Sequence, residues 1–316
     1  MLPNICEVKP EFQFQEGGSC TICRTKAVFK NLCKEHFMQD VETTVATTIE
    51  KYKLFNKEEK VFVAYSGGKD STVLLSILHS LGYNTDAITV NASIGCYSKT
   101  NFENCVKLCD ELGIKLHEIS LRREFGYSLC SIKSLFEEQK INVSSCSICG
   151  VLRRYLLNKY GRSLGADKIA LGHNLDDECQ VILMNLMKGN PELLSRLGPV
   201  SGSVRHEAFI PRVKPLYFVE EEDIVAYSTL AQFPVHYGQC PCGVESFRYK
   251  IRQVLRSDFK KNIVTSFITF LPALKSEFEG GVIGECKQCG EPASKVQCKA
   301  CNILEVMNDR CSVAEE

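Results

Sequence analysis

The sequence predicts an α/β fold built on a doubly wound parallel sheet, with a small metal-binding module near each end of the chain. Two observations predict it. Short apolar segments at 61–65, 86–90, 114–120 and 168–172 alternate with helical patterns at about 101–112, 150–164 and 175–188. Closely spaced pairs of metal-ligating residues occur toward both termini. No internal repeat or low-complexity linker interrupts the alternation.

The length of the chain fits one large domain and two small modules. Its 316 residues can hold an α/β domain of roughly 200 residues with short additions. We expect an N-terminal zinc finger and linker helix over 1–50, the α/β domain over 51–279 and a zinc ribbon over 280–316. Gly280-Gly281 is the clearest break before the last cysteines.

Composition limits the class of protein. The formal net charge is zero, so a nucleic-acid-binding surface must be a local patch. The chain has neither an N-terminal basic segment followed by an apolar core nor a run of 18 apolar residues, which disfavours secretion and membrane spanning. We therefore expect a cytoplasmic protein without a membrane partner. In that compartment, 18 cysteines indicate metal ligands or redox groups rather than disulfides.

A glycine-rich segment predicts a phosphate site. The apolar run 61–65 and the helical pattern 72–78 flank Ser66-Gly67-Gly68-Lys69-Asp70-Ser71-Thr72. A strand, a glycine turn and a helix N-terminus direct free N–H groups and the positive end of the helix dipole at an anion. Paired glycines allow close approach of the backbone to phosphate. The Walker A spacing is absent, and an ordinary glycine turn is the alternative interpretation.

A second loop is expected to face this segment. The apolar run 168–172 ends in a loop that carries Gly172, His173, Asn174, Asp176, Asp177 and Glu178. Ligands of open α/β sheets bind beyond the carboxyl ends of the strands. Asp176 and Asp177 can coordinate Mg²⁺ or transfer a proton, but capping of a helix N-terminus explains the same acids. His173 is either functional or a packed structural histidine. By the same edge argument, Ala64 and Ala92 would border an adenine ring.

Two sets of four ligands predict structural zinc sites. Cys20, Cys23, Cys33 and His36 form one set, and Cys286, Cys289, Cys298 and Cys301 form the other. Each set consists of two close pairs, as a closed tetrahedral site requires, and leaves no position open for catalysis. Modules with such small cores need the metal to fold. Chance pairing in a cysteine-rich chain is the alternative.

A third cysteine group differs from these two. Cys146 and Cys149 form a pair, whereas Cys240 lies much later in the chain. Three converging thiolates around a [4Fe–4S] cluster would leave one iron without a protein ligand. Cys242 is then either a bystander or a fourth ligand that closes a cluster or a zinc site. We interpret the remaining thiols as buried or bystander groups, namely Cys6, Cys96, Cys105, Cys109, Cys130, Cys179 and Cys311.

The segment 246–261 is the strongest local candidate for RNA binding. Its basic residues are Arg248, Lys250, Arg252, Arg256, Lys260 and Lys261, and Phe247, Tyr249 and Phe259 lie among them. Phosphate contacts and aromatic stacking on bases would hold an RNA. A solvated helix face explains the same charges, but the nearby Cys240 favours a substrate-binding surface.

The motifs together resemble a known family. Ser-Gly-Gly-Lys-Asp-Ser after an apolar strand is similar to the PP-loop of the N-type ATP pyrophosphatases, which have an adenine nucleotide α-hydrolase-like fold and cleave ATP between the α and β phosphates. The order of the cysteine pairs, this loop, Gly-His-Asn-Leu-Asp-Asp-Glu, Cys-Pro and the final four cysteines resembles the tRNA 2-thiouridine thiolases of the TtuA and NcsA types. The resemblance covers nearly the whole chain.

That resemblance implies a tRNA uridine 2-sulfurtransferase: ATP adenylates the C2 oxygen of a uridine, AMP and pyrophosphate are released, and sulfur replaces the oxygen. It implies that Cys146, Cys149 and Cys240 hold the cluster and that Asp177 and Arg153 occupy the catalytic positions. Arg153 departs from the lysine of the TtuA type and cannot readily exchange a proton, so we expect it to stabilise charge. The expected ATP-binding residues are Ala64, Ser66, Gly67, Gly68, Lys69, Asp70, Ser71, Ala92 and Gly172.

The expected cofactors are ATP, Mg²⁺, one [4Fe–4S] cluster and two Zn²⁺. The expected partners are tRNA, a second copy of the chain and a sulfur donor, either sulfide or a ubiquitin-like thiocarboxylate protein. Two alternatives remain at this point. One is a thiolase that uses a cysteine persulfide on Cys146, Cys149 or Cys240 in place of the cluster. The other is a zinc-dependent RNA-binding scaffold without ATPase activity.

Overall fold

The computed structural model describes residues 12–202, 206–238, 240–243, 247–255, 257–278 and 283–308. Five positions named above, Cys6, Arg256, Gly280, Gly281 and Cys311, lie outside these ranges. Within them, no helix combines the length and apolar character needed to cross a membrane.

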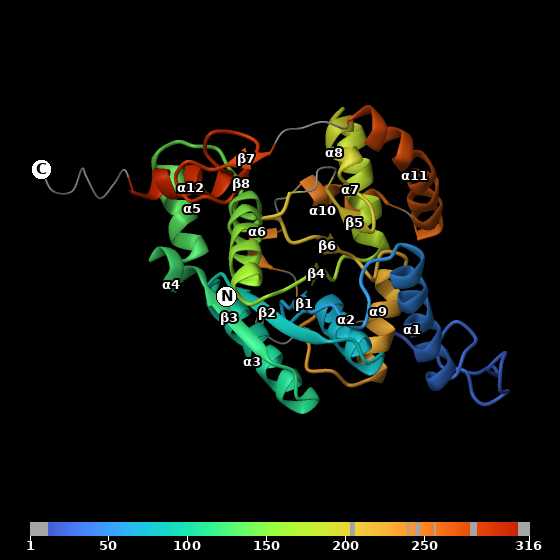
Figure 1. Cartoon of the computed structure of the whole chain (residues 1–316). Helices are drawn as coiled ribbons and strands as arrows, with labels where there is room; N and C mark the ends of the chain where they lie inside the picture. The colour runs from blue at the N-terminus through green and yellow to red at the C-terminus, as the bar shows by residue number, and fades with distance from the viewer. Residues whose placement is uncertain are drawn as a thin grey trace, which may run out of the picture.

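A six-stranded sheet forms the centre of the molecule (Figure 1). Its strands are β1 (Val61–Ala64), β2 (Thr85–Asn91), β3 (Leu116–Ser120), β4 (Lys168–Ala170), β5 (Val200–Ser201) and β6 (Arg212–Val213). Their order is β3-β2-β1-β4-β6-β5, and every neighbouring pair is parallel except β5 with β6. The strand order reverses between β1 and β4, so the carboxyl ends of these two strands border a crevice. The predicted doubly wound parallel sheet is confirmed.

Helices cover both faces of the sheet. Between the strands the chain forms α2 (Lys69–Ser80), α3 (Gly95–Leu112), α4 (Leu121–Phe125), α5 (Leu129–Glu138), α6 (Ser145–Ser163), α7 (Leu175–Met187) and α8 (Pro191–Ser195). After the sheet come α9 (Glu221–Leu230), the short 3₁₀ helix η1 (Pro241–Gly243), α10 (Phe247–Val254) and α11 (Ser257–Glu277). The three helical patterns expected from the sequence correspond to parts of α3, α6 and α7.

Alternation along β1 assigns its side chains to two separate cores. Val61 and Val63 pack with α2 and α9, whereas Phe62 packs on the opposite face with α5 and α6. All three side chains are fully buried. A strand buried on both faces is a continuous apolar run, which is why this short segment was recognisable in the sequence. A third apolar cluster joins α7, α8 and α11 beside the sheet.

The two cysteine-rich modules lie at opposite sides of this domain (Figure 1). The N-terminal module leads into α1 (Lys34–Lys51), which contacts α9. The C-terminal module consists of β7 (Gly284–Glu285), β8 (Pro292–Ala293) and α12 (Lys299–Asn308). Its helix packs against α5 and α6, and its Glu291 carboxylate accepts a hydrogen bond from Asn158 on α6 (2.8 Å). Both modules are therefore attached to the α/β domain.

Candidate active site and metal centres

The turn after β1 needs glycine for a steric reason. Gly67 has φ +78°, a left-handed conformation that favours glycine, and a Cβ there would overlap the carbonyl oxygen of Asn101 on α3. Ser66 and Ser71 brace the turn, because the Ser66 N–H donates to the Ser71 hydroxyl oxygen (3.1 Å) and the two hydroxyls lie 3.0 Å apart. The turn is compact and brings α3 directly over its backbone.

Helix α2 begins in a form suited to an anion. Gly68 is its N-cap, and no described side chain caps the first-turn N–H groups. The uncapped N–H groups and the positive end of the helix dipole thus converge at the end of β1. The structure thus contains the strand, glycine turn and helix N-terminus that the sequence predicted around Ser66 to Thr72, and phosphate binding there stays a prediction.

The loop after β4 meets this turn across the crevice. Gly172 lies so close to α2 that a Cβ there would come within 2.9 Å of the Ser71 nitrogen. Asn174 donates from Nδ2 to the Asp70 carboxylate (2.8 Å) and also caps α7 by accepting the Asp177 N–H (2.9 Å). The two loops predicted to face each other are therefore joined through Asn174.

Charged groups surround the turn. Lys69 Nζ lies 3.0 Å from a carboxylate oxygen of Asp70 and 3.0 Å from one of Glu221, at the start of α9. Burial alone would lower the pKa of Lys69, but these carboxylates raise it, so the ammonium stays charged. Burial raises the pKa of the Asp70 carboxyl, and the charge of Asp177 adds to that effect. Asp70 and Asp177 are thus two neighbouring carboxylates beside the predicted phosphate position.

The three acids of α7 have different partners. Asp177 completes a capping box with Asn174 and forms an ion pair with Arg248 of α10 (2.5 Å). Asp176 is buried, accepts the Glu221 N–H (2.8 Å) and pairs with Lys260 of α11. Glu178 forms a buried pair with Lys214 (2.8 Å). Helix capping therefore explains part of this acidic run, and Asp177 is the most exposed of the three carboxylates.

His173 is neutral near pH 7. Burial lowers its pKa to about 3, and the cations Lys214 and Arg248 add to the effect. Its Nδ1 is buried without a hydrogen-bond partner. A neutral imidazole can donate one hydrogen bond and accept another, but it has no positive charge with which to attract a phosphate.

The predicted adenine border is only partly free. Ala64 ends β1 and is half-buried, whereas Ala92 is fully buried and its carbonyl accepts the Leu129 N–H (3.1 Å). The Ala92 carbonyl is therefore already used within the fold. Ala64 lies beside the turn that begins at Ser66.

The central cysteines come together although 94 positions separate Cys146 from Cys240. The Cys146 thiol donates to the Cys242 carbonyl (3.2 Å), which fixes η1 against the first turn of α6. Cys149, Cys240 and Cys242 pack against the same apolar cluster. Burial raises the pKa of Cys146, and the adjacent thiols of Cys240 and Cys149 raise it further. In each terminal set all four ligand atoms lie within 4.8 Å of one another. In the part of the chain that the structure describes, the sulfur atoms of Cys146, Cys149 and Cys240 do not all lie that close together.

Arg153 shares a face of α6 with the cysteine pair. Residues 146, 149 and 153 follow the spacing that places side chains on one side of a helix. The Arg153 Nε is buried without a hydrogen-bond partner. A buried guanidinium nitrogen without a partner is suited to an incoming oxygen anion.

The start of α3 connects the turn to the cysteines. Tyr97 contacts His236 edge-to-face (5.6 Å between ring centroids), and the backbone of His236 pairs with that of Gly68. Burial raises the pKa of Tyr97, and the nearby Cys240 thiol raises it further. The His236 Nε2 is buried without a partner. Tyr97 and His236 gave no signal in the sequence because no motif contains them.

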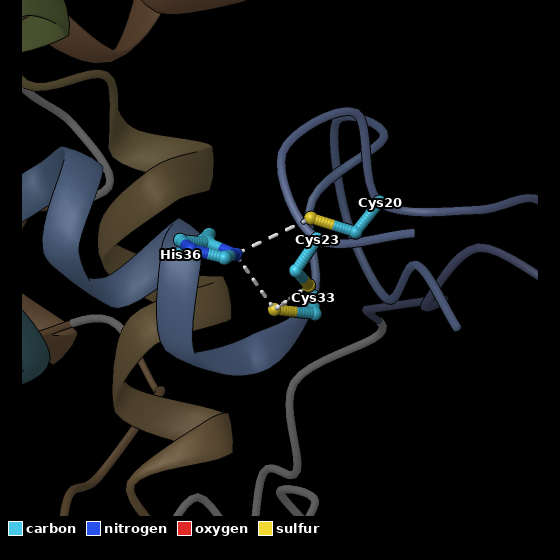
Figure 2. Close-up of side chains that lie close together, drawn as sticks. All are labelled: Cys20, Cys23, Cys33 and His36. Atoms are coloured by element: carbon cyan, nitrogen blue, oxygen red, sulfur yellow. Dashed lines mark hydrogen bonds between the residues drawn. The ribbon is translucent and has the colours of Figure 1, made fainter. Parts of the chain in front are cut away.

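The N-terminal ligand set is assembled (Figure 2). The sulfur atoms of Cys20 and Cys33 lie 3.4 Å and 3.3 Å from His36 Nδ1, and those of Cys23 and Cys33 are 3.7 Å apart. His36 is on α1, and the cysteines come from the preceding loops. Burial would raise the pKa of Cys20, but backbone N–H groups of Cys23 and Cys33 help to lower it to about 5. Such a thiolate fits a tetrahedral Zn²⁺.

The C-terminal set has the same design. The four sulfur atoms lie within 4.8 Å of one another, those of Cys289 and Cys298 being 3.8 Å apart. Backbone N–H groups of Cys298 and Cys301 donate to the sulfurs of Cys286 and Cys298 (3.3 Å each). Gly290 has φ +71° in the turn after the first pair. The donor set and its N–H···S bonds suit a closed zinc site.

The basic segment is less free than its sequence indicates. Arg248 pairs with Asp177, Arg252 with Glu221 (2.7 Å) and Lys260 with Asp176. Lys250 and Lys261 are exposed on α10 and α11. The segment thus borders the candidate site through three ion pairs and presents further cations to solvent.

Comparison with known proteins agrees with this geometry. A family model described as a PP-loop domain matches residues 37–257. The tRNA-5-methyluridine(54) 2-sulfurtransferase of Pyrococcus horikoshii is 35% identical over 294 residues, which cover 89% of this chain and 92% of that protein. The enzyme of the same name from Thermotoga maritima is 34% identical over 301 residues, covering 92% of this chain and 97% of that protein.

A solved structure is also similar over most of its length. It is the U34-tRNA thiolase NcsA from Methanococcus maripaludis with its [4Fe–4S] cluster. The TM-score is 0.74 at 28% identity, and the match covers 92% of this chain and 97% of that one. The match thus spans nearly the whole of both chains.

Proposed function

The chain is a sulfurtransferase of the PP-loop family and of its tRNA 2-thiolation group, and on that premise we propose that it is a tRNA uridine 2-sulfurtransferase. In this proposal the C2 oxygen of a uridine attacks the α-phosphate of ATP and pyrophosphate leaves. Sulfur then attacks C2 and AMP leaves. The observation that carries the proposal is the junction of the two loops at Asn174 beside an uncapped helix N-terminus, with the thiols of Cys149 and Cys240 near Tyr97.

The residues of the turn support the first step. The free N–H groups of α2 and the Lys69 ammonium would bind the phosphates of ATP, and Ser66 and Ser71 would hold the turn. Asp70 and Asp177 offer neighbouring carboxylate oxygens, which suit Mg²⁺ bound to phosphate.

The three thiols support a cluster rather than a single ion. Cys149 and Cys240 pack against one apolar cluster and Cys146 contacts Cys242, but the three soft ligands are spread more widely than the zinc ligands. Ligands of different irons in one cluster lie further apart than ligands of one ion. When bound, a [4Fe–4S] cluster with three protein ligands supplies one iron that can hold the incoming sulfur. Arg153 would stabilise negative charge at phosphate or at the C2 oxygen.

The remaining parts of the proposal concern partners and structural metals. Both terminal sets would hold Zn²⁺ and keep their modules folded. The exposed side chains of Lys250 and Lys261 would contact tRNA phosphates. Sulfide or a ubiquitin-like thiocarboxylate protein would supply sulfur, and the enzyme would work as a homodimer. Its location would be cytoplasmic, like that of the similar cytoplasmic tRNA 2-thiolation protein 1 of Anopheles gambiae.

The decisive experiment uses the whole chain, purified without oxygen. It is mixed with unmodified tRNA, ATP, Mg²⁺ and sulfide, and tRNA nucleosides are analysed by mass spectrometry while AMP and pyrophosphate are quantified. We expect 2-thiouridine formed with one AMP per sulfur. RNase mapping of the product identifies the uridine, because the relatives include enzymes of position 54 and of U34.

Two results would overturn parts of this proposal. Full activity of a protein that contains zinc but no iron would exclude the cluster and favour a thiolase that uses a cysteine persulfide. Failure to form AMP with any tRNA would leave a zinc-dependent RNA-binding scaffold.

A further inference from the structure

A fourth thiol adjoins the three proposed cluster ligands. Cys242 follows Cys240 after a single proline, and both residues lie where η1 meets α6. The backbone of Cys242 is held in place because its carbonyl accepts the Cys146 thiol (3.2 Å). Its position relative to the ligand set is therefore determined by a described contact.

The Cys242 side chain packs against the cluster that also holds two of the proposed ligands. It is half-buried and packs against the same apolar cluster as Cys149 and Cys240. A half-buried thiol in a group of soft ligands is well placed to bind the same metal centre.

Cys130 is a weaker candidate for the same role. It is exposed on α5, whereas Cys242 is linked to the ligand Cys240 through one residue. A short covalent link and a fixed carbonyl reduce the entropy that Cys242 would lose on binding. Cys130 therefore serves as the matched control.

We propose that the Cys242 thiolate is an exchangeable fourth protein ligand, which occupies the open iron of the resting cluster and leaves when sulfide binds. This inference rests on the proposed function, since it requires the three-cysteine cluster. In the exchange, hydrosulfide takes the place of the Cys242 sulfur and gives its proton to that sulfur. No electron is transferred. The fourth iron thus has a protein ligand until a sulfur donor arrives.

The test compares the native chain with Cys242→Ser and Cys130→Ser, all purified without oxygen. Iron, sulfide and zinc are quantified first, and Cys242→Ala replaces Cys242→Ser if the latter does not retain two zinc ions. Hydrosulfide is then titrated, and its binding is followed by Mössbauer spectroscopy and by the electron paramagnetic resonance of the reduced cluster. If the closed form holds nine-tenths of the native protein, native affinity for hydrosulfide is lowered about tenfold.

We therefore expect Cys242→Ser to bind hydrosulfide about tenfold more tightly than the native chain, while Cys130→Ser behaves as native. Mössbauer spectra should show one distinct iron in Cys242→Ser before hydrosulfide is added. Identical spectra and affinities in the native chain and Cys242→Ser would overturn the inference but leave the proposed function intact. If the native protein held no iron, both this inference and the cluster of the proposed function would be overturned.

Discussion

The terminal ligand sets and the central cysteine group contain the same residue type in two different designs. Each terminal set comes from one short stretch, with all four ligand atoms within 4.8 Å. The central group joins α6 to residues near 240, and its sulfurs are not that close together. The difference teaches that a compact set of four fits one ion in a closed site, whereas a wider set of three, with a fourth thiol nearby, fits a larger centre that exchanges a ligand.

The two designs also depend on the fold in opposite ways. The C-terminal module has only a small apolar cluster of its own among the described residues, made of the buried Cys286, Ala293 and Cys301, so the metal must supply much of its stability. The central group lies on a domain with large apolar cores on both faces of the sheet. Removing a ligand should therefore unfold the first and merely inactivate the second.

The largest effect is expected from Cys301→Ser. Loss of one ligand should release one zinc ion and unfold the C-terminal module, because structural zinc contributes on the order of 10 kcal/mol to such modules. Zinc analysis and limited proteolysis check this, while ATP binding by the α/β domain should persist. The exposed Cys96→Ser is the control. Retention of two zinc ions and of protease resistance would contradict the prediction.

Cys149→Ser should affect activity without affecting the fold. We expect loss of iron and a fall in tRNA thiolation of about 10³-fold, or about 4 kcal/mol, because the sulfur-handling centre loses a ligand. Zinc content and thermal unfolding should match those of the native chain, with Cys96→Ser again as the control. If an iron-free Cys149→Ser protein kept native activity, the central cysteines would not hold a cluster that thiolation requires.

Gly67→Ala separates the nucleotide half of the site from the sulfur half. An added Cβ would meet the Asn101 carbonyl in a left-handed turn, so we expect ATP binding to weaken about 10- to 100-fold, while iron and zinc contents stay unchanged. Calorimetric titration with ATP measures the effect. Gly113→Ala is the matched control, because Gly113 also has positive φ (+66°) but open space around it. It should cost about 1 kcal/mol of stability and leave ATP affinity unchanged. Equal ATP affinities in the two variants would argue against the phosphate-binding turn.

The smallest effect concerns His173 and pH. Its folded pKa of about 3 lies below the ordinary value of about 6.5, so unfolding takes up a proton when the pH falls below about 6.5. Stability that is complete near pH 7 should decrease toward pH 3. Between pH 7 and pH 5.5 the loss should be about 1 kcal/mol greater in the native chain than in His173→Gln. Urea unfolding at both pH values measures this, and effects of acid on the zinc sites cancel in the comparison. If both proteins lost the same unfolding free energy between the two pH values, His173 would not be a buried neutral group in the folded protein.

The sequence by itself determined the features that depend on neighbours along the chain. Apolar runs indicated the strands, the glycines indicated the turn after β1, and each terminal set was recognisable because all its ligands fall within one short stretch. Local spacing sets local geometry, so these patterns carry their structural meaning directly. The capping interpretation of the α7 acids was likewise available from the sequence.

Only the tertiary structure decided which groups meet across the chain. It committed Asp176 to Lys260 and Asp177 to Arg248, and it used the Ala92 carbonyl for Leu129. It also placed Cys242 against Cys146 and His236 against the turn. These contacts join residues tens of positions apart, and they follow from strand order and helix packing rather than from any local pattern.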